Sequence, residues 1–288
     1  MSVRRRSRYT IQRQVGHVSL YVLATFFAML FMGPFIWAIL SSLKGPTEIY
    51  LFPPTWIPRE VHWENYARIW EMAPLARFYA NTVLITVMVT IGTLISATLV
   101  AYGFARFEFR GREFLFLLVI STLIMPDEVT IVPRFLLFRS LGWLDTYLPL
   151  TVPFFFGSAF SIFLMRQFIR TIPRALDEAA EIDGASDLRI LRSILLPILA
   201  PALASIAIFA SLGAWNDFLH PLIYLRTTAK YTLALGLRFF QTTPNVGEGP
   251  REPYLMAASL MVALPPILLF LSAQRYFIRG ITLSGIKG

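Results

Sequence analysis

The chain has 288 residues, of which 56% are hydrophobic and only 15% are charged, whereas charged residues make up about 25% of ordinary soluble domains. This composition excludes a disordered chain and leaves too few polar residues to cover the surface of a soluble domain. The net charge of +9 indicates basic cytoplasmic loops of a membrane protein, not a nucleic-acid partner, because no basic face alternates with exposed aromatic residues. The chain contains no cysteine, which excludes disulfides, thiol catalysis and cysteine–zinc sites.

Six charge-free runs predict the membrane-spanning helices of an all-α polytopic protein. About 20 apolar residues suffice to cross a bilayer as a helix. Five runs reach that length: 14–43, 78–105, 146–165, 193–216 and 253–274. The remaining run, 114–126, has 13 residues. At the helical rise per residue it covers only about 20 Å of a hydrocarbon core about 30 Å thick.

The distribution of lysine and arginine indicates that the short run crosses as well, because cytoplasmic loops carry an excess of these residues. With six crossings, the segments expected in the cytoplasm hold 16 basic residues in 65 positions: 1–16, 105–112, 166–192 and 275–288. The external segments hold 10 in 89 positions: 44–77, 127–145 and 217–252. We therefore predict six spans with both termini in the cytoplasm, the third being extended or broken around Pro126, Asp127 and Glu128.

The segment between the fourth and fifth runs predicts a short helix. Pro173 suits the first position of a helix, and Asp177 and Glu178 would lie in its first turns, where acidic side chains interact favourably with the helix dipole. Helical spacing places three apolar residues on one face: Ala175, Ala179 and Ile182. A small face with an acidic edge suits insertion into a groove of another protein, and an ordinary solvated loop is the alternative.

A reversal and a second helix follow. Gly184 permits the left-handed backbone of a sharp turn. Ser186 or Asp187 can cap a helix that runs on to Pro197. The whole segment is therefore predicted to form a helix–turn–helix on the cytoplasmic surface.

The same segment resembles the EAA loop of the membrane subunits of binding-protein-dependent ABC importers. That family has Glu-Ala-Ala, three further residues, Gly, and then a hydrophobic helix that ends in Ile-x-Leu-Pro. Here the pattern reads Glu178-Ala179-Ala180, Glu181-Ile182-Asp183, Gly184-Ala185 and Ile194-Leu195-Leu196-Pro197. A pattern of this length, in a loop expected in the cytoplasm, is specific.

The resemblance covers most of the chain and is to the carbohydrate-importer branch, in particular to the smaller membrane subunit of maltose-type and glycerol-phosphate-type importers. The similar stretches are Phe52-Pro53-Pro54, Phe163 to Phe168, Trp215 to Phe218 with Pro221-Leu222, Gln274 to Phe277 with Arg279-Gly280, and Gly285 to Gly288. The chain departs from the family pattern in two places. Leu191 stands where an aromatic residue is frequent, and Asp127-Glu128 places two acids where the family is less charged.

The resemblance implies the all-α fold of a type I ABC importer permease, in four parts. These are a cytoplasmic N-terminus at 1–16, a first helix at 17–43 with an outer loop at 44–77, a core domain at 78–277 that contains the EAA loop at 169–197, and a cytoplasmic tail at 278–288. It implies a transport subunit and not an enzyme, in agreement with the lack of a GxxxxGK[ST] phosphate loop. No cofactor, metal site or nucleic-acid partner is expected, and the location is a bacterial or archaeal inner membrane.

The implied partners are a second homologous membrane subunit, a dimer of cytoplasmic ATP-binding subunits, an extracytoplasmic solute-binding protein and membrane lipid. The EAA loop would act as a coupling helix seated in a cleft of the ATPase and would transmit its closure to spans four and five. Glu178 would make a charge-assisted contact there, and Gly184 would provide the bend. The residues implied at this contact are Asp177, Glu178, Ala179, Ala180, Asp183, Gly184 and Ala185.

Asn216 and Asp217, at the outer end of the fifth run, are candidates for the translocation pathway, although acids at helix ends also occur at the membrane interface with no further role. Two other functions stay open. A secondary transporter would need ionisable residues within its spans to carry a coupling ion, and the runs contain none apart from the neighbouring Asp127 and Glu128. A channel or scaffold subunit would have no ATPase partner. The solute implied by the resemblance is a carbohydrate or a glycerol-phosphate compound.

Overall fold

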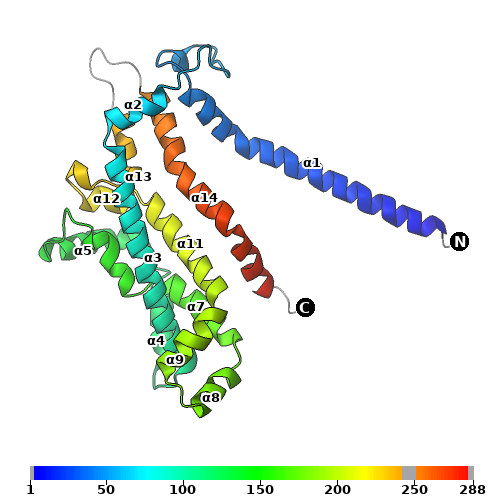
Figure 1. Ribbon diagram of the computed structural model, residues 1–288, viewed down its shortest axis with the longest axis vertical. Coiled ribbons are helices and arrows are strands. Elements are labelled where there is room, and N and C mark those ends of the chain that lie inside the picture. The colour runs from blue at the N-terminus through cyan, green and yellow to red at the C-terminus, as the bar shows by residue number, and fades with distance from the viewer. Residues whose placement is uncertain (1–2, 242–250, 285–288) are drawn as a thin grey trace. The chain divides into compact units, whose positions relative to one another are not determined.

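The computed structural model describes residues 3–241 and 251–284, and side chains are described for 17–241 and 251–272. The regular structure of this part of the chain is helical, without a strand (Figure 1). The helices form two compact units. One comprises the residues up to Met72 together with Phe239–Met261, and the other comprises Ala73–Arg238 with the residues from Val262 onward.

The first unit begins with α1 (Val3–Ser42), whose part from His17 to Ser42 is long and apolar enough to cross a membrane. The most apolar stretch of this part is not buried within the chain, and large apolar side chains lie exposed from Val18 to Ile39. A helix with apolar side chains on every side is suited to lipid or to another membrane helix. The helix predicted at 17–43 corresponds to this part of α1.

Polar contacts order the loop that follows α1. The side-chain amide of Asn65, the first residue of α2 (Asn65–Met72), donates to the carbonyl oxygens of Ser42 at 2.8 Å and Lys44 at 3.0 Å. Lys44 is buried, and its ammonium group lies 4.3 Å from the centre of the Trp37 ring. The loop therefore has a polar core of its own.

The 3-10 helix η1 (Glu48–Tyr50) and the beginning of α14 (Glu252–Ser284) complete the first unit. Arg68 of α2 donates to the hydroxyl of Tyr254 in α14 at 3.1 Å. The tail residues Gly285 to Gly288, which resemble family tails, lie outside the described residues.

The central helix of the second unit is α3 (Leu75–Arg106), against which α7 (Ala159–Thr171) and α11 (Ala200–Asn216) pack (Figure 1). Small residues line α3 where it is covered, among them the completely buried Ala97 and Ala101. Small side chains let helices approach closely in lipid, where apolar burial alone gives no preference for helix over acyl chain.

One close approach on α3 requires glycine. A Cβ at Gly92 would lie 2.6 Å from the ring of Phe155, in the 3-10 helix η2 (Val152–Phe155). One turn further along, the hydroxyl of Ser96 donates to the carbonyl oxygen of Phe154 at 2.9 Å. Gly92 and Ser96 therefore allow η2 to pack closely against α3.

The other helices are shorter. Those between α3 and α7 are α4 (Arg112–Ser121), α5 (Asp127–Ser140) and α6 (Leu148–Thr151). Between α7 and α11 lie α8 (Ala175–Ile182), α9 (Asp187–Ile190), the π-helix η3 (Leu191–Leu195) and α10 (Leu196–Ile198). After α11 follow α12 (Leu219–Tyr224), η4 (Thr228–Lys230), α13 (Leu233–Gly236) and η5 (Leu237–Phe240).

The described chain has four helical segments that are long and apolar enough to cross a membrane: His17–Ser42, Leu75–Arg106, Leu148–Thr171 and Glu252–Ser272. A fifth crossing results if α9 to α10 and α11, which are bent by 80° at their junction, form one broken span. The predicted all-α fold with several membrane helices is therefore confirmed. The short run 114–126 corresponds largely to α4, which has 10 residues, so the sixth crossing stays a prediction.

Proline accounts for two interruptions of the predicted spans. Pro126 has an extended backbone, with φ −60° and ψ 136°, and immediately precedes α5, so the chain is broken where the sequence predicts a break. The fifth run bends at Leu199, just before α11. Pro201 explains this bend, because it has no N–H for the carbonyl group of Pro197 and its ring would clash with that group.

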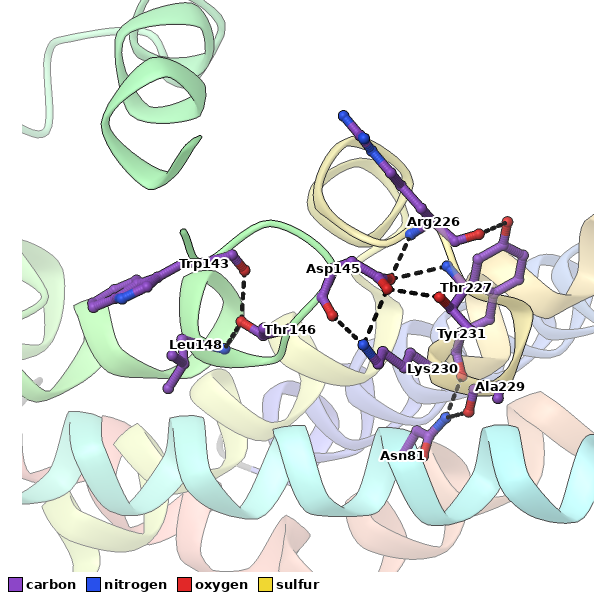
Figure 2. A network of polar contacts seen from close by, with 10 residues as sticks. All are labelled: Asn81, Trp143, Asp145, Thr146, Leu148, Arg226, Thr227, Ala229, Lys230 and Tyr231. Atoms are coloured by element: carbon purple, nitrogen blue, oxygen red, sulfur yellow. Dashed lines mark hydrogen bonds and ion pairs between the residues drawn. The ribbon is translucent and has the colours of Figure 1, made fainter. Parts of the chain in front are cut away.

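Asp145 joins two loops of the second unit (Figure 2). Its Oδ1 accepts hydrogen bonds from the backbone N–H groups of Arg226 and Thr227, both at 2.9 Å. Its Oδ2 accepts from the Thr227 hydroxyl at 2.6 Å and from the Lys230 ammonium group at 3.0 Å. These donors, with the Thr227 hydroxyl foremost, hold the pKa of Asp145 well below its ordinary value. The partners lie 81 or more residues away, so the local sequence contains no sign of this contact.

Candidate functional site

The segment that resembles the EAA loop forms the predicted helix–turn–helix at one end of the second unit (Figure 1). Its first helix, α8, begins at Ala175, and Arg174 occupies the N-cap position. Pro173 therefore lies just before the helix and not at its first position as predicted. Asp177 and Glu178 lie in the first turn of α8, where acidic side chains favour the helix dipole.

The turn after α8 has the backbone that the sequence predicts. Gly184 adopts a left-handed conformation with φ +78°. Its N–H donates to the carbonyl oxygen of Glu181 at 2.9 Å, and the N–H of Ala185 donates to that of Ala180 at 2.9 Å. This pair of bonds is the Schellman motif, which ends a helix and reverses the chain. Ser186 then stands at the N-cap position of α9, although its side chain makes no capping hydrogen bond.

One face of α8 is buried against the rest of the second unit. The carboxylate of Asp177 lies 2.6 Å from Nε of Arg106, at the end of α3, and both side chains are largely buried. Burial raises the pKa of Asp177 above its ordinary value, and the charge of Arg106 opposes this effect. Ala180 packs into the same hydrophobic cluster as Ile190 and Tyr102. Two of the predicted contact residues, Asp177 and Ala180, are thus turned toward the protein's own core.

The opposite face of α8 is exposed. Ala175, Glu178 and Ala179 lie on it, together with Ile182, whose relative exposure is 87%. Beyond the turn, Leu188 of α9 is 68% exposed. We call these five residues the outer face of α8–α9. Sequence reasoning missed Leu188, which follows the turn and lies outside the apolar face predicted for the first helix.

The outer face differs from an ordinary solvated loop in its apolar content. Ile182 and Leu188 project from either side of the turn with no cover from the described chain. Two exposed large apolar side chains in a short loop that also exposes a carboxylate suit a surface that binds another protein. Asp183 and Gly184 are exposed at its edge, whereas Ala185 is half-buried against the hydrophobic cluster beneath.

At the end of α11, the predicted pathway residues face different partners. The side-chain amide of Asn216 donates to the carbonyl oxygen of Leu212 within its own helix, at 2.9 Å. Asp217 accepts from the backbone N–H of His220 at 3.2 Å, and its Oδ2 lies 3.0 Å from Nδ1 of the same residue. The other ring nitrogen of His220, Nε2, lies 3.3 Å from a carboxylate oxygen of Asp127. A histidine between two carboxylates joins α5 to α12.

Asn216 and Asp217 both line a cavity of about 410 Å³ within the second unit. Its wall contains the aromatic rings of Phe154, Phe160 and Phe209. A second cavity of about 580 Å³ shares Asp217 and His220 with the first and extends toward α5. Aromatic surface with a few hydrogen-bonding groups suits a polar organic solute. Among the described residues, no cluster of three or more histidine, aspartate or glutamate side chains is arranged to hold a metal ion.

Comparison with known proteins agrees with this architecture. Residues 92–283 match the family described as "Binding-protein-dependent transport system inner membrane component". The chain is 34% identical over 266 residues to the arabinooligosaccharides transport system permease protein AraQ of Halalkalibacterium halodurans, which covers 91% of this chain and 94% of that protein. It is 31% identical over 259 residues to the sn-glycerol-3-phosphate transport system permease protein UgpE of Yersinia enterocolitica, covering 88% and 91%.

A solved structure is similar over nearly the whole chain. It belongs to a bacterial ABC transporter involved in the import of the acidic polysaccharide alginate, with a TM-score of 0.82, 26% identity, and coverage of 92% of this chain and 98% of that one. The family match begins within α3 and includes α7, α8, α9 and α11 of the second unit. The chain therefore belongs to the family of inner-membrane components of binding-protein-dependent transport systems, and it is a transport subunit of an ABC importer, not an enzyme.

Proposed function

We propose that this chain forms half of the translocation pathway of an importer for a carbohydrate or a related solute. The names of its relatives support this solute class, since they refer to arabinooligosaccharides, sn-glycerol 3-phosphate and alginate. The two cavities at the end of α11 offer aromatic surface and hydrogen-bonding groups, which carbohydrate recognition requires. In this proposal Asn216 and Asp217 face the solute as it passes.

The outer face of α8–α9 is the surface by which the importer is coupled to ATP hydrolysis. It inserts into a cleft of a cytoplasmic ATPase subunit, where Glu178 meets a basic or hydrogen-bonding group and Ile182 and Leu188 are covered. The exposure of these apolar side chains is the observation that carries the proposal. A charge-assisted hydrogen bond at the edge of an apolar contact gives both affinity and orientation.

The buried face of α8 transmits the closure of the ATPase to the membrane helices. Asp177 is paired with Arg106 of α3, and the hydroxyl of Tyr102, also of α3, donates to the carbonyl oxygen of Asp187 at 3.3 Å. A displacement of α8 therefore acts directly on the central helix. We assign Asp177 and Ala180 to this internal connection, and Glu178 and Ala179 to the contact with the ATPase.

The assembly contains the partners that the family's transport mechanism requires. They are a second homologous membrane subunit, a dimer of ATP-binding subunits and an extracytoplasmic solute-binding protein, all within the surrounding lipid. The excess of basic residues in the segments around α8 supports a cytoplasmic position for this end, and six spans would place both termini on the same side.

Reversal of the charge at Glu178 tests the coupling role. Glu178→Lys replaces attraction by repulsion at a contact that is buried only in the assembled importer. We expect normal insertion into the membrane, weaker copurification of the ATPase subunit, and loss of ATP hydrolysis stimulated by the solute-loaded binding protein. Breaking a buried ion pair costs about 3–5 kcal/mol, whereas breaking an exposed pair costs less than about 1 kcal/mol. The loss of affinity for the ATPase therefore also indicates how deeply the contact is buried.

Glu181→Lys is the matched control. It makes the same charge reversal on the same helix, at an exposed position one turn beyond Glu178 that does not belong to the outer face of α8–α9. A parental transport rate for Glu178→Lys, with the ATPase still bound, would show that the loop is a solvated connector. Equal defects in both variants would instead indicate a general effect of charge on the loop, and the specific contact of Glu178 would be refuted.

A further inference from the structure

A pocket lined by arginine lies at the end of the second unit that carries α8. It has a volume of about 320 Å³. Its arginines come from the end of α3, the start of α4, and α7 with the residues that follow it. They are Arg106, Arg112, Arg166, Arg170 and Arg174. We call this group the arginine pocket.

Acidic residues neutralise only part of this charge. Glu113 pairs with Arg112 at 3.1 Å and with Arg166 at 2.8 Å, and Asp177 pairs with Arg106 at 2.6 Å. Glu108 lies 3.5 Å from Arg174, and both side chains are more than half exposed. The five arginines of the pocket and the three carboxylates that pair with them together carry a net charge of +2. No ion pair of Arg170 is present in the described part of the chain.

Two of the arginines are held rigidly before any ligand binds. The side chain of Arg166 is only 4% exposed, lies 3.8 Å above the Phe116 ring, and donates from Nε to the carbonyl oxygen of Phe104 at 3.3 Å. Arg106 is similarly buried and donates to the carbonyl oxygen of Ile172 at 3.1 Å. Guanidinium groups fixed in this way lose little freedom on binding, and their planar donors match the oxygens of a phosphate group.

The surface beside the pocket is apolar. Arg112 begins α4, and the next turns of that helix expose Phe114, Leu117 and Leu118 by 65%, 62% and 48%. In the loop before α4, Phe109 is 45% exposed. A cationic pocket followed by an exposed apolar helix face matches an amphiphile, with its charged group in the pocket and its chains along the helix.

We propose that the arginine pocket binds the phosphate group of an anionic phospholipid of the cytoplasmic leaflet, with the acyl chains lying along α4. The pocket lies where two basic segments meet, 105–112 and 166–192, both of which the charge distribution assigns to the cytoplasm. Basic pockets between membrane helices on that side are suited to acidic lipid headgroups, and the cytoplasmic leaflet supplies them.

Bound lipid would also affect the position of α8. Pro173 and Arg174 line the pocket and lead directly into this helix, and Arg106 connects the pocket to Asp177 within it. The headgroup would therefore strengthen the junction between α7, α3 and α8. Binding of lipid does not depend on the role of Glu178, so failure of one proposal leaves the other intact.

The test uses the assembled importer, stripped of lipid in a neutral detergent. Native mass spectrometry would count bound molecules during titration with dioctanoyl phosphatidylglycerol, with dioctanoyl phosphatidylcholine, and with phosphatidylglycerol in competition with inorganic phosphate. We expect phosphatidylglycerol to bind in preference to phosphatidylcholine. The double variant Arg170→Gln, Arg174→Gln should bind it about tenfold more weakly, because two charge-assisted donors are lost.

The double variant Arg189→Gln, Arg192→Gln is the matched control, because it removes the same charge from the same loop at exposed positions outside the pocket. It should retain parental affinity for phosphatidylglycerol. Equal binding by the pocket variant and the parent would overturn the proposal, as would equal affinity for the two lipids. Displacement of phosphatidylglycerol by an equal concentration of inorganic phosphate would overturn the assignment to lipid and identify a soluble phosphate as the ligand. Unchanged elution profiles of both double variants would show that neither has lost its fold.

Discussion

The carboxylate of Asp145 stabilises the contact between two loops of the second unit, and its replacement by the isosteric amide should weaken that contact (Figure 2). Asp145→Asn keeps the size of the side chain but removes its charge and turns one acceptor into a donor that faces Thr227 and Lys230. Hydrogen bonds to charged groups contribute roughly 1.5–3 kcal/mol each, so we expect a loss of about 2 kcal/mol or more. The measurement is the thermal midpoint of the protein purified in detergent.

Glu60→Gln provides the comparison for this prediction. Glu60 is an exposed acid in the loop before α2, and a surface substitution of this kind changes stability by less than about 0.5 kcal/mol. Equal thermal midpoints for Asp145→Asn and Glu60→Gln would show that the Asp145 contacts contribute nothing to stability.

His220 should make the stability of the second unit depend on pH. The hydrogen bond to Asp217 raises the pKa of His220 above its ordinary value, and the Asp217 and Asp127 charges act in the same direction, while burial and Arg134 oppose it. A group with a raised pKa in the folded state stabilises the fold fully below its unfolded pKa. This stabilisation is lost as the pH rises through the folded value. The thermal midpoint should therefore decrease as the pH is raised from about 6 to about 8, the range around the ordinary histidine pKa of about 6.5.

The variant His220→Gln isolates this effect, because glutamine can still donate to Asp217 but does not titrate in that range. Its thermal midpoint should vary less with pH than that of the parent protein. If the thermal midpoints of the two proteins changed with pH in parallel, His220 would not be charged between Asp217 and Asp127.

At the scale of elements, the turn between α8 and α9 depends on one backbone conformation. Gly184 has φ +78°, and a residue with a Cβ costs roughly 1–2 kcal/mol in this region, with the β-branched residues least tolerated. Gly184→Val should shift the turn, displace Ile182 relative to Leu188, and reduce transport and stimulated ATP hydrolysis. The variant should still reach the membrane, because the spans do not depend on this turn.

Two further variants separate backbone strain from the addition of volume. No atom lies within 4 Å of a Cβ placed at Gly184, so space is not the limitation there. Gly184→Asn should keep most of the activity, since asparagine tolerates the left-handed conformation. Gly103→Ala, in open space on α3, should keep parental activity. Equal activity of Gly184→Val and Gly184→Asn would contradict the requirement for this backbone.

Elements determined by local chemistry could be predicted from the sequence, whereas contacts between distant segments could not. The turn at Gly184 follows from a residue that permits the left-handed backbone, and the break at Pro126 follows from a residue that restricts its own backbone. The pairing of Asp177 with Arg106 joins residues that are far apart in the chain, and it depends on how α8 lies against α3. For the same reason, the sequence placed Asp177 and Glu178 in one contact, whereas in the structure Asp177 is buried and Glu178 is exposed.

For the whole molecule, the number of crossings decides on which side of the membrane α8 lies. Four segments qualify as single spans, and the bent pair that includes α11 adds a fifth. The run 114–126, which contains most of α4, would supply the sixth, extended or broken around Pro126. The 10-residue α4 is too short to cross alone, because a crossing needs roughly 20 residues.

Because the chain has no cysteine, single cysteines can be placed without background labelling. Arg110 lies before α4 and Ser140 ends α5, and both are exposed, so these two positions flank the predicted sixth crossing. We expect a membrane-impermeant maleimide to label Ser140→Cys in intact cells, as it should label Glu60→Cys in the predicted outer loop. Arg110→Cys should react only after the membrane is permeabilised. If Ser140→Cys also required permeabilisation, α4 and α5 would not cross. The following span would then carry α8 to the outside, where no ATPase can reach Glu178, so this one position tests the topology and the coupling proposal together.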